Sequence, residues 1–238
     1  MSFINSGVLA HERPNTRRRP LFPLYQVMSQ NTLIHRSIRP VIRATARTGL
    51  TPNHLTTVRL VTALASAILV GTGNHRWSDI GAAFFAVSFL LDRADGELAR
   101  QTGQLSAAGH RFDLCSDFAA NITFFLGLGF GLRGVLGNSA IMLGGIAGLS
   151  IVAIFALVDH IQRVEGPTAA IFPSFANCDP DDAMIIVPIA IWCGAQTYIL
   201  VAAAIGAPSF FAWTCWRRRR HLAQLRPGSL VRRASIHQ

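Results

Sequence analysis

Four aspartates between residues 92 and 117 are the side chains of this sequence best suited to chemistry. Asp92 and Asp95 lie at the end of one apolar segment, and Asp113 and Asp117 lie near the start of the next. A carboxylate at membrane depth is costly unless a partner or a water-filled cavity relieves it. Four of them require a counter-charge, and a pair of divalent cations is the simplest one. The pattern therefore indicates a metal-dependent enzyme.

Helical periodicity predicts that each pair of acids shares one side of its helix. At about 100° per residue two stripes form: Asp92, Asp95, Gly96 and Ala99 on one helix, and Gly109, Asp113 and Asp117 on the next. Residues 101–108 form a short reversal, so we expect the stripes to face each other across an antiparallel helix pair. The glycines let the backbones, or a substrate, approach closely. Oxygen ligands select Mg²⁺ or Mn²⁺ over zinc, and two such ions support phosphoryl transfer.

The stretch matches the signature D-x2-D-G-x2-A-R-x8-G-x3-D-x3-D of the CDP-alcohol phosphatidyltransferase family, which the chain resembles. Every fixed position is present: Asp92, Asp95, Gly96, Ala99, Arg100, Gly109, Asp113 and Asp117. An ordinary structural alternative is that the acids only pair with neighbouring arginines, Arg93, Arg100 and Arg111. That alternative gives no reason for the glycines or for the fixed gaps, so we favour the family resemblance.

The resemblance implies a six-helix membrane enzyme that transfers a substituted phosphate from a CDP-linked donor to an alcohol and releases CMP. It implies that the four aspartates surround two metal ions, Mg²⁺ or Mn²⁺, and that Asp117 also acts as the catalytic base. It further implies a set of donor-binding residues: Asn53, Thr56, Gly96, Ala99, Arg100, Ser106 and Gly109.

Two further interpretations, one of a donor segment and one of a possible acceptor residue, have ordinary structural alternatives. The segment Thr51-Pro52-Asn53 resembles the start of the family's first helix, but threonine, asparagine and proline also favour any helix start. Arg163 could bind the phosphate of an anionic acceptor such as glycerol 3-phosphate or inositol phosphate. A basic residue near a helix C-terminus can equally well interact with the helix dipole and with lipid headgroups.

The composition is that of a membrane protein. The chain has 238 residues, of which 50% are hydrophobic and only 14% charged, and its mean hydropathy is +0.36. Its net charge of +10 comes with arginines that mostly flank apolar runs. We therefore expect anionic lipid headgroups as the partner of these arginines, and no nucleic acid. The four cysteines show no metal-binding spacing.

The fold class that we predict is an all-α integral membrane protein with six transmembrane helices. We expect three parts: an Arg-rich segment at 1–50, a six-helix domain at 51–216 and a basic tail at 217–238. The expected helices span about 51–70, 79–100, 107–132 and 139–160, followed by two within 183–216 that divide near 193–196. Residues 33–49 have the pattern of an amphipathic helix lying in the interface, with a solvated basic helix as the alternative.

The arginines also predict the orientation of the chain in the membrane. With both termini in the cytoplasm, the external loops hold only Arg76 and Arg133. This asymmetry is the positive-inside pattern, and it places the aspartates on the cytoplasmic side. We expect a multi-pass protein of the bacterial inner membrane, and we keep a homodimer open as its assembly state.

The most concrete prediction is transfer of a phosphatidyl group from CDP-diacylglycerol to an alcohol, as a step of phospholipid biosynthesis. A second reading keeps the site but takes CDP-choline or CDP-ethanolamine as donor and diacylglycerol as acceptor. A reading from another class is a cation carrier that uses the acids as an ion path. It explains aspartates within the membrane, but not Gly96, Arg100 and Gly109 at their gaps.

Overall fold

The computed structural model describes residues 51–104, 106–165 and 184–224. Every regular element in these ranges is helical: α2 (Pro52–Gly71), α3 (His75–Thr102), α4 (Ala107–Gly131), α5 (Arg133–Leu136), α6 (Ser139–Glu165), α7 (Ile186–Trp192) and α8 (Gln196–Gln224). The amphipathic helix expected at 33–49 lies outside the described residues. The described part of the chain therefore confirms the all-α prediction.

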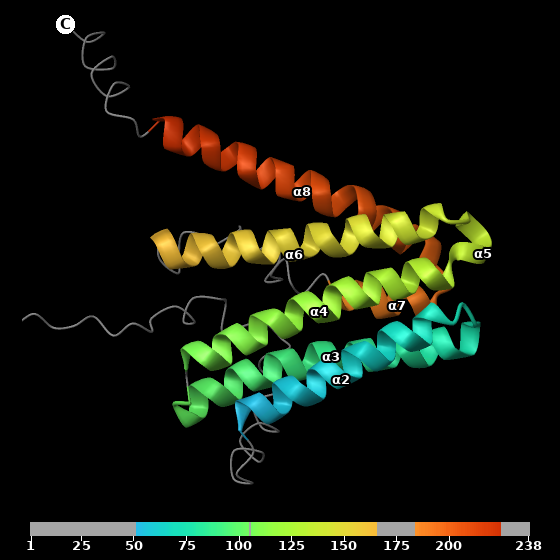
Figure 1. Cartoon of the computed structure of the whole chain (residues 1–238), viewed down its shortest axis with the longest axis horizontal. Helices are drawn as coiled ribbons and strands as arrows, with labels where there is room; N and C mark the ends of the chain where they lie inside the picture. Colours follow the sequence, from blue (N-terminus) through green and yellow to red (C-terminus); the bar gives the residue numbers. More distant parts are fainter. Residues whose placement is uncertain (1–50, 105, 166–183, 225–238) are drawn as a thin grey trace, which may run out of the picture.

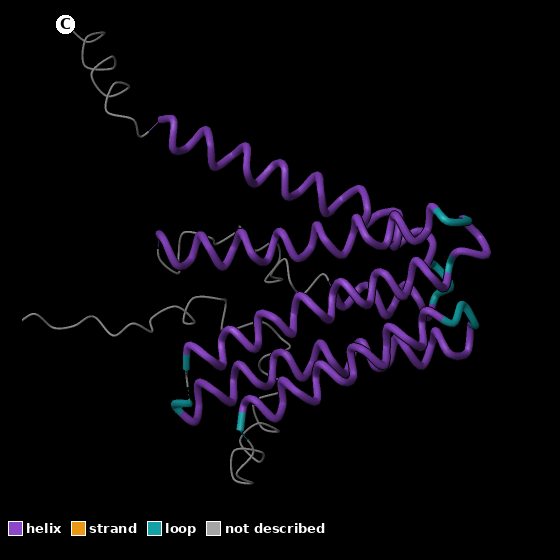
Figure 2. Tube along the Cα trace, viewed as in Figure 1, coloured by secondary structure: helices purple, strands orange, loops and turns teal. Residues whose placement is uncertain are grey.

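The long helices run roughly alongside one another (Figures 1 and 2). α2 packs against both α3 and α4, α6 packs on the far side of α4, and α8 packs against α6. The short α7 contacts α3 and α8. The N-terminal end of α2, the C-terminal end of α3 and the N-terminal end of α4 all lie at the same end of this bundle (Figure 1). The four aspartates are therefore brought to one region by the topology alone.

The boundaries of the helices agree with those predicted, with three main differences. α3 begins at His75 rather than near 79, because the side chain of Asn74 caps it by accepting a hydrogen bond of 3.0 Å from the backbone nitrogen of Arg76. α6 continues to Glu165, five residues beyond the predicted end at His160, and α8 continues to Gln224, eight residues beyond the predicted end at Trp216. The predicted division of the last apolar block is confirmed, since α7 ends at Trp192 and α8 begins at Gln196.

Four of the described helices are long and apolar enough to cross a membrane: α2, α4, α6 and α8. Large apolar side chains on their outer faces are exposed, among them Ile68, Met142 and Leu149. Such a surface suits contact with lipid rather than water. The described residues thus form the all-α fold of a membrane protein. Its α3 ends in a charged stretch and its described α7 is only seven residues long, so neither of them meets the same criterion.

Glycines allow α4 to approach α2 and α6 at close to backbone contact. A Cβ on Gly127 would collide with the carbonyl oxygen of Ala67 in α2, and one on Gly131 would collide with that of Val70. On the opposite side of α4, Gly144 of α6 lies equally close to the backbone of Phe125. Small residues four apart are the usual means by which helices pack closely in membranes.

α3 and α4 form the predicted antiparallel pair, with α2 packed against both of them. The two helices run in opposite directions around a turn at Gly103, whose φ of +67° is in the left-handed region. Their contact with each other is slight, however, because α2 packs extensively against both of them. Two hydrogen bonds join α2 to α3: the hydroxyl of Ser66 donates to the carbonyl oxygen of Gly81, and that of Ser88 donates to the carbonyl oxygen of Arg59. The carboxylates therefore meet across the surface of α2.

Substitution of Gly127 by alanine tests this packing. We expect Gly127→Ala to lower the apparent Tm of the detergent-solubilised protein, because the added methyl group must push α2 away from α4. Overpacking of this kind costs about 1–3 kcal/mol. Gly145→Ala in α6 is the matched control, since its Cβ would meet only Leu126 Cδ2 at 3.8 Å. Equal Tm values for the two variants, measured by differential scanning fluorimetry, would contradict the assignment of close α2–α4 contact.

Candidate active site

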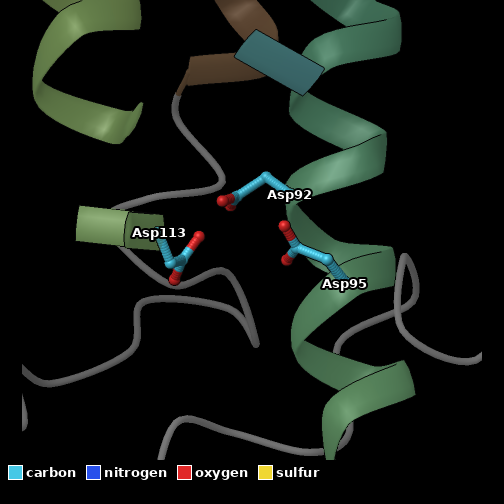
Figure 3. A group of neighbouring side chains, drawn as sticks. All are labelled: Asp92, Asp95 and Asp113. Carbon is cyan, nitrogen blue, oxygen red and sulfur yellow. The ribbon is translucent and has the colours of Figure 1, made fainter. Parts of the chain in front are cut away.

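Three carboxylates from two helices converge at the end of the bundle. Asp92 and Asp95 project from α3 and Asp113 projects from α4, and their side chains point toward one another (Figure 3). One oxygen atom of each lies within 4.8 Å of one oxygen of the other two. Asp95 is buried, with 4% of its side chain exposed, whereas Asp92 and Asp113 are 31% and 23% exposed. The cluster is thus closed on the side of Asp95 and open on the other.

Thr56 of α2 holds the innermost of these carboxylates. Its hydroxyl donates a hydrogen bond of 2.8 Å to Asp95 Oδ2, and it also lies 3.1 Å from the carbonyl oxygen of Pro52. Thr56 itself is buried. The family resemblance predicted that Thr56 binds the donor, but in the structure its hydroxyl contacts the acidic cluster and its own helix. Thr56 therefore orients an acid.

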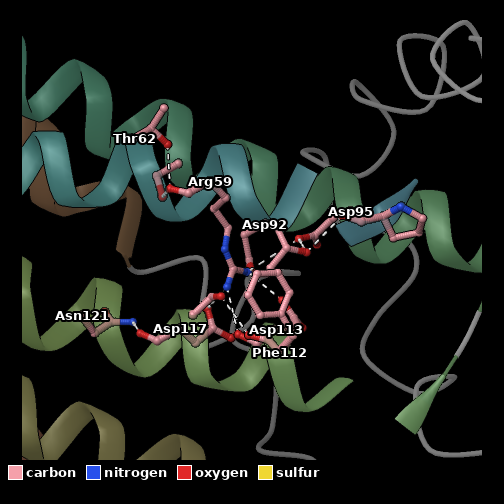
Figure 4. A network of polar contacts seen from close by, with 12 residues as sticks. Arg59, Thr62, Asp92, Asp95, Phe112, Asp113, Asp117 and Asn121 are labelled. Carbon is pink, nitrogen blue, oxygen red and sulfur yellow. Dashed lines mark hydrogen bonds and ion pairs between the residues drawn. The ribbon is translucent and has the colours of Figure 1, made fainter. Parts of the chain in front are cut away.

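Arg59, which was not among the site residues predicted from the sequence, lies at the centre of the site. This arginine of α2 is 1% exposed, and its guanidinium extends into the group of acids (Figure 4). Nη1 pairs with Asp92, lies 2.9 Å from Asp113 Oδ1 and lies 3.9 Å from Asp95 Oδ2. A signal was present, because Arg59 is the only charged residue between 52 and 75, and an ionisable residue within a spanning helix usually has a functional partner.

Asp117 occupies a separate position from the other three acids. It lies one helical turn after Asp113 on α4, and its Oδ1 is 3.3 Å from Nη2 of Arg59. It is not part of the group of three whose oxygens lie within 4.8 Å of one another. Its backbone oxygen accepts a hydrogen bond of 2.9 Å from Asn121 Nδ2. The structure thus brings three of the predicted ligands together and places the fourth beside them, on the other side of the guanidinium.

The predicted donor residues at the start of α2 and α4 lie next to each other. Ser106 is the N-cap of α4, and its Oγ accepts a hydrogen bond of 3.0 Å from the backbone nitrogen of Gly109. A Cβ on Gly109 would lie 3.0 Å from that oxygen and 3.4 Å from Asn53 Oδ1. Asn53 and Ser106 also line an open pocket of about 320 Å³, together with Thr51, Pro52 and Gln104. Sequence segments about fifty residues apart thus form one wall.

The remaining predicted donor residues follow the acids on α3. Arg100 is held by Glu97, whose Oε2 accepts bonds of 3.1 Å and 2.8 Å from Nε and Nη2. Gly96 lies beside it, since a Cβ on Gly96 would be 3.8 Å from Nη1 of Arg100. Ala99 is half-buried on the same helix. The ion pair that the structure gives for Arg100 is with Glu97 and not with one of the four aspartates.

Arg163 lies on α6 itself rather than beyond the end of a helix, because α6 is longer than predicted. Its Nη2 is 2.7 Å from Asp159 Oδ2 and 3.4 Å from Nε2 of His110. The same His110 nitrogen is 3.0 Å from Asp159 Oδ1. His110 directly follows Gly109 of the signature, so this polar group joins the start of α4 to the end of α6. About half of the Arg163 side chain is exposed.

The chemistry of the cluster fits a divalent cation. Asp92, Asp95 and Asp113 offer only carboxylate oxygens, which are the ligands that Mg²⁺ and Mn²⁺ prefer. With Asp117 the site contains four carboxylates, and Arg59, which pairs with all four of them, contributes one positive charge. When all four acids are ionised, the group keeps an excess of negative charge. The residues present are therefore those that a hard cation needs.

Two solved structures have a fold similar to that of the chain. Both are crystal structures of phosphatidylinositol phosphate synthase of Mycobacterium tuberculosis. The apo form is 20% identical in sequence with a TM-score of 0.54, and the match covers 74% of this chain and 95% of that one. The form with CDP-DAG bound is 22% identical with a TM-score of 0.54, and the match covers 82% and 96%. At these identities the likeness shows the fold alone.

The sequence comparisons give a family. The comparison with curated protein sequences found no significant match. The family model described as CDP-alcohol phosphatidyltransferase matches residues 49–207. That range holds all of the described helices up to the middle of α8, and it includes the three acids that converge in Figure 3. Because the match covers well over half of the chain, the protein belongs to the CDP-alcohol phosphatidyltransferase family.

Proposed function

We propose that this enzyme transfers the phosphatidyl group of CDP-diacylglycerol to an alcohol and releases CMP, as a step of phospholipid biosynthesis. The observation that carries the proposal is the convergence of Asp92, Asp95 and Asp113 at one end of a bundle of apolar helices. A lipid-linked donor suits a site built on such helices. The similar mycobacterial enzyme, crystallised with CDP-DAG bound, also supports this choice of donor.

The proposed metal ligands are the four signature aspartates: Asp92, Asp95, Asp113 and Asp117. We propose two ions, Mg²⁺ or Mn²⁺, which when bound would neutralise the diphosphate and the departing CMP. The close approach of three of the acids supports this assignment. Asp117 stands apart from them, which suits the second role proposed for it.

We propose that Asp117 accepts the proton of the acceptor hydroxyl. The hydroxyl oxygen then forms a bond to the β-phosphorus of the donor, while the bond between that phosphorus and the bridging oxygen breaks. The electron pair of the broken bond leaves with CMP, and the proton remains on the carboxylate of Asp117. Nη2 of Arg59, 3.3 Å from Asp117 Oδ1, holds that carboxylate beside the other acids. A base must lie within hydrogen-bond reach of the proton that it takes.

The donor is proposed to lie along the wall formed by the starts of α2 and α4. Asn53 and Ser106 line the pocket there, and Gly109 leaves the space between them open. Thr56 would act indirectly, through Asp95. On α3, Gly96 and Ala99 would let the donor approach the helix. Arg100 would bind the diphosphate through its planar fork of donors, and to do so it must exchange Glu97 for phosphate.

We propose that α3 and the segment containing α7 also cross the membrane, which gives six spans. The charged end of α3 is the part that carries the aspartates, so functional residues account for its lower hydropathy. The arginine distribution supports a cytoplasmic location of both termini and of the active site, in a bacterial inner membrane.

The acceptor is proposed to be a phosphorylated alcohol, such as glycerol 3-phosphate or inositol phosphate, bound in part by Arg163. Arg163 lies at the same end of the bundle as the acids, and half of its side chain is exposed. It is paired with Asp159 at 2.7 Å, so the acceptor phosphate would have to compete with that carboxylate. His110 lies close enough to both to take part.

Removal of divalent metal tests the proposed metal site. We expect excess EDTA to abolish release of CMP from CDP-diacylglycerol by the purified protein, because the acids then lack the ions that neutralise the diphosphate. Mg²⁺ or Mn²⁺ added back should restore the activity. Full activity in the presence of the chelator would refute a metal-dependent transfer.

Asparagine substitutions should separate the ligands from the base. Asp92→Asn and Asp113→Asn should weaken binding of metal and of donor together, because each removes a charge from the cluster of three. Asp117→Asn should lower turnover by roughly 10²–10⁴-fold while leaving donor affinity largely intact, since its role as base belongs to the chemical step. Donor affinity is measured by calorimetry and turnover by CMP release. An equal loss of donor affinity in all three variants would make Asp117 a further ligand.

The role of Arg163 in binding the acceptor can be tested by kinetics. Loss of a charge-assisted bond to phosphate costs about 1.5–3 kcal/mol, so Arg163→Ala should raise the KM of a phosphorylated acceptor roughly tenfold to a hundredfold. The KM of the donor should barely change. Arg100→Ala is the matched variant and should show the reverse. If Arg163→Ala behaves like the wild type with every phosphorylated alcohol tested, a neutral or zwitterionic alcohol becomes the better candidate.

A further inference from the structure

One nitrogen atom of Arg59 contacts all three carboxylates of the cluster. Nη1 pairs with Asp92, lies 2.9 Å from Asp113 and lies 3.9 Å from Asp95. The oxygens of these same three residues lie within 4.8 Å of one another. One positively charged atom therefore balances all three carboxylates from a single position. In Figure 4 the guanidinium of Arg59 extends from α2 into this group of acids.

A metal ion held by the three aspartates would need the same place. Carboxylate ligands of Mg²⁺ or Mn²⁺ must converge on one point at a short distance, and Mg²⁺ in particular demands near-ideal geometry. Nη1 already occupies an oxygen atom of Asp92 and one of Asp113, two of the carboxylates that the ion would need. Two positive charges in contact with the same oxygens also repel each other. Binding of the ion therefore requires Nη1 to withdraw.

The rest of the Arg59 side chain allows such a withdrawal. Nη2 lies 3.0 Å from the backbone oxygen of Asp113 and 3.3 Å from Asp117 Oδ1, so the guanidinium already has a second set of acceptors on α4. Its Nε, although buried, has no hydrogen-bond partner among the described residues. The guanidinium is thus held by the contacts of Nη1 and Nη2. The acceptors of Nη2 on α4 remain available when Nη1 leaves the cluster.

We propose that Arg59 is an exchangeable counter-ion of the metal site. It neutralises the carboxylates when no metal is bound. When metal binds, Nη1 gives up the carboxylates of Asp92 and Asp113, while Nη2 keeps its contacts with the backbone oxygen of Asp113 and with Asp117. Arg59 is then a positioning residue that stabilises the metal-free protein and lowers the affinity for metal. This inference rests on the proposed metal site, but it concerns binding and stability rather than turnover.

Arg59→Gln gives the sharpest test, with Arg76→Gln as the control that removes an exposed arginine near the start of α3. The full-length protein in detergent is examined for its Tm in EDTA and in Mn²⁺, and for its Mn²⁺ affinity by paramagnetic resonance of the free ion. We expect Arg59→Gln to have a lower Tm than the wild type in EDTA, a larger rise in Tm with Mn²⁺, and about a tenfold lower Kd for Mn²⁺, because the competing charge is gone. Arg76→Gln should match the wild type.

A second substitution tests whether charge is the reason. In EDTA, the double variant Arg59→Gln/Asp92→Asn should regain much of the Tm lost by Arg59→Gln, since it removes one negative charge along with the positive one. If Arg59→Gln folds only when Mn²⁺ is present, that result also supports the proposal. If it folds in neither condition, Arg59→Lys decides: a Kd for Mn²⁺ equal to or below that of the wild type supports the proposal, and a higher one overturns it.

The outcomes that contradict the proposal are distinct from a failure of the proposed function. Suppose that the wild-type protein binds Mn²⁺ and that Arg59→Gln has an unchanged or higher Kd for Mn²⁺. This result would overturn the role of Arg59 as a competitor and leave the metal site intact. A wild-type protein that binds no Mn²⁺ would overturn the metal site itself, and this inference with it.

Discussion

Four carboxylates are held close together at the end of an apolar helix bundle, and one buried guanidinium lies among them. Like charges so close repel each other strongly in surroundings of low dielectric, and burial of an unpaired charge is costly. Arg59 relieves both effects at once, because it contacts acids on α3 and on α4 from a third helix. The ion pairs of Arg59 therefore help to hold α2, α3 and α4 in their relative positions. A helix that moved away would leave a charge without its partner.

The two ends of α2 pack against α4 in different ways. Towards its C-terminus, Gly127 and Gly131 of α4 bring the two backbones close to contact. Towards its N-terminus, polar side chains lie between the helices, chiefly Arg59 and the aspartates around it (Figure 4). Close packing holds the helices together at one end, and the polar end contains the charged groups that exchange partners in the proposed binding of metal. This division explains how a rigid bundle can contain a site in which charged side chains must rearrange.

The sequence predicts the positions of the aspartates well and their surroundings less well. Asp92, Asp95 and Asp113 could be placed together because helical periodicity and a short reversal are local properties. Arg59 could not be placed by the same means, since its contacts join residues 33 to 58 positions apart and depend on which helix packs between α3 and α4. Arg163 shows a similar limit, because its pairing with Asp159 and its proximity to His110 depend on the length of α6 and on its packing against α4. Local pattern identifies the reactive groups, and tertiary packing decides their partners.

The place of Arg59 on the first of the described helices has a consequence for biosynthesis. The chain is made from its N-terminus, so α2 leaves the ribosome before α3 and α4 exist. During that interval an arginine about two turns into an apolar helix has none of the aspartates that surround it in the finished protein, and such a residue opposes insertion by about 3 kcal/mol at the centre of a spanning helix. The aspartates of α3 and α4 then supply its partners one after another. We expect α2 to become firmly committed to its membrane-spanning position only when the later helices arrive, so that completion of the site and completion of membrane insertion are the same event.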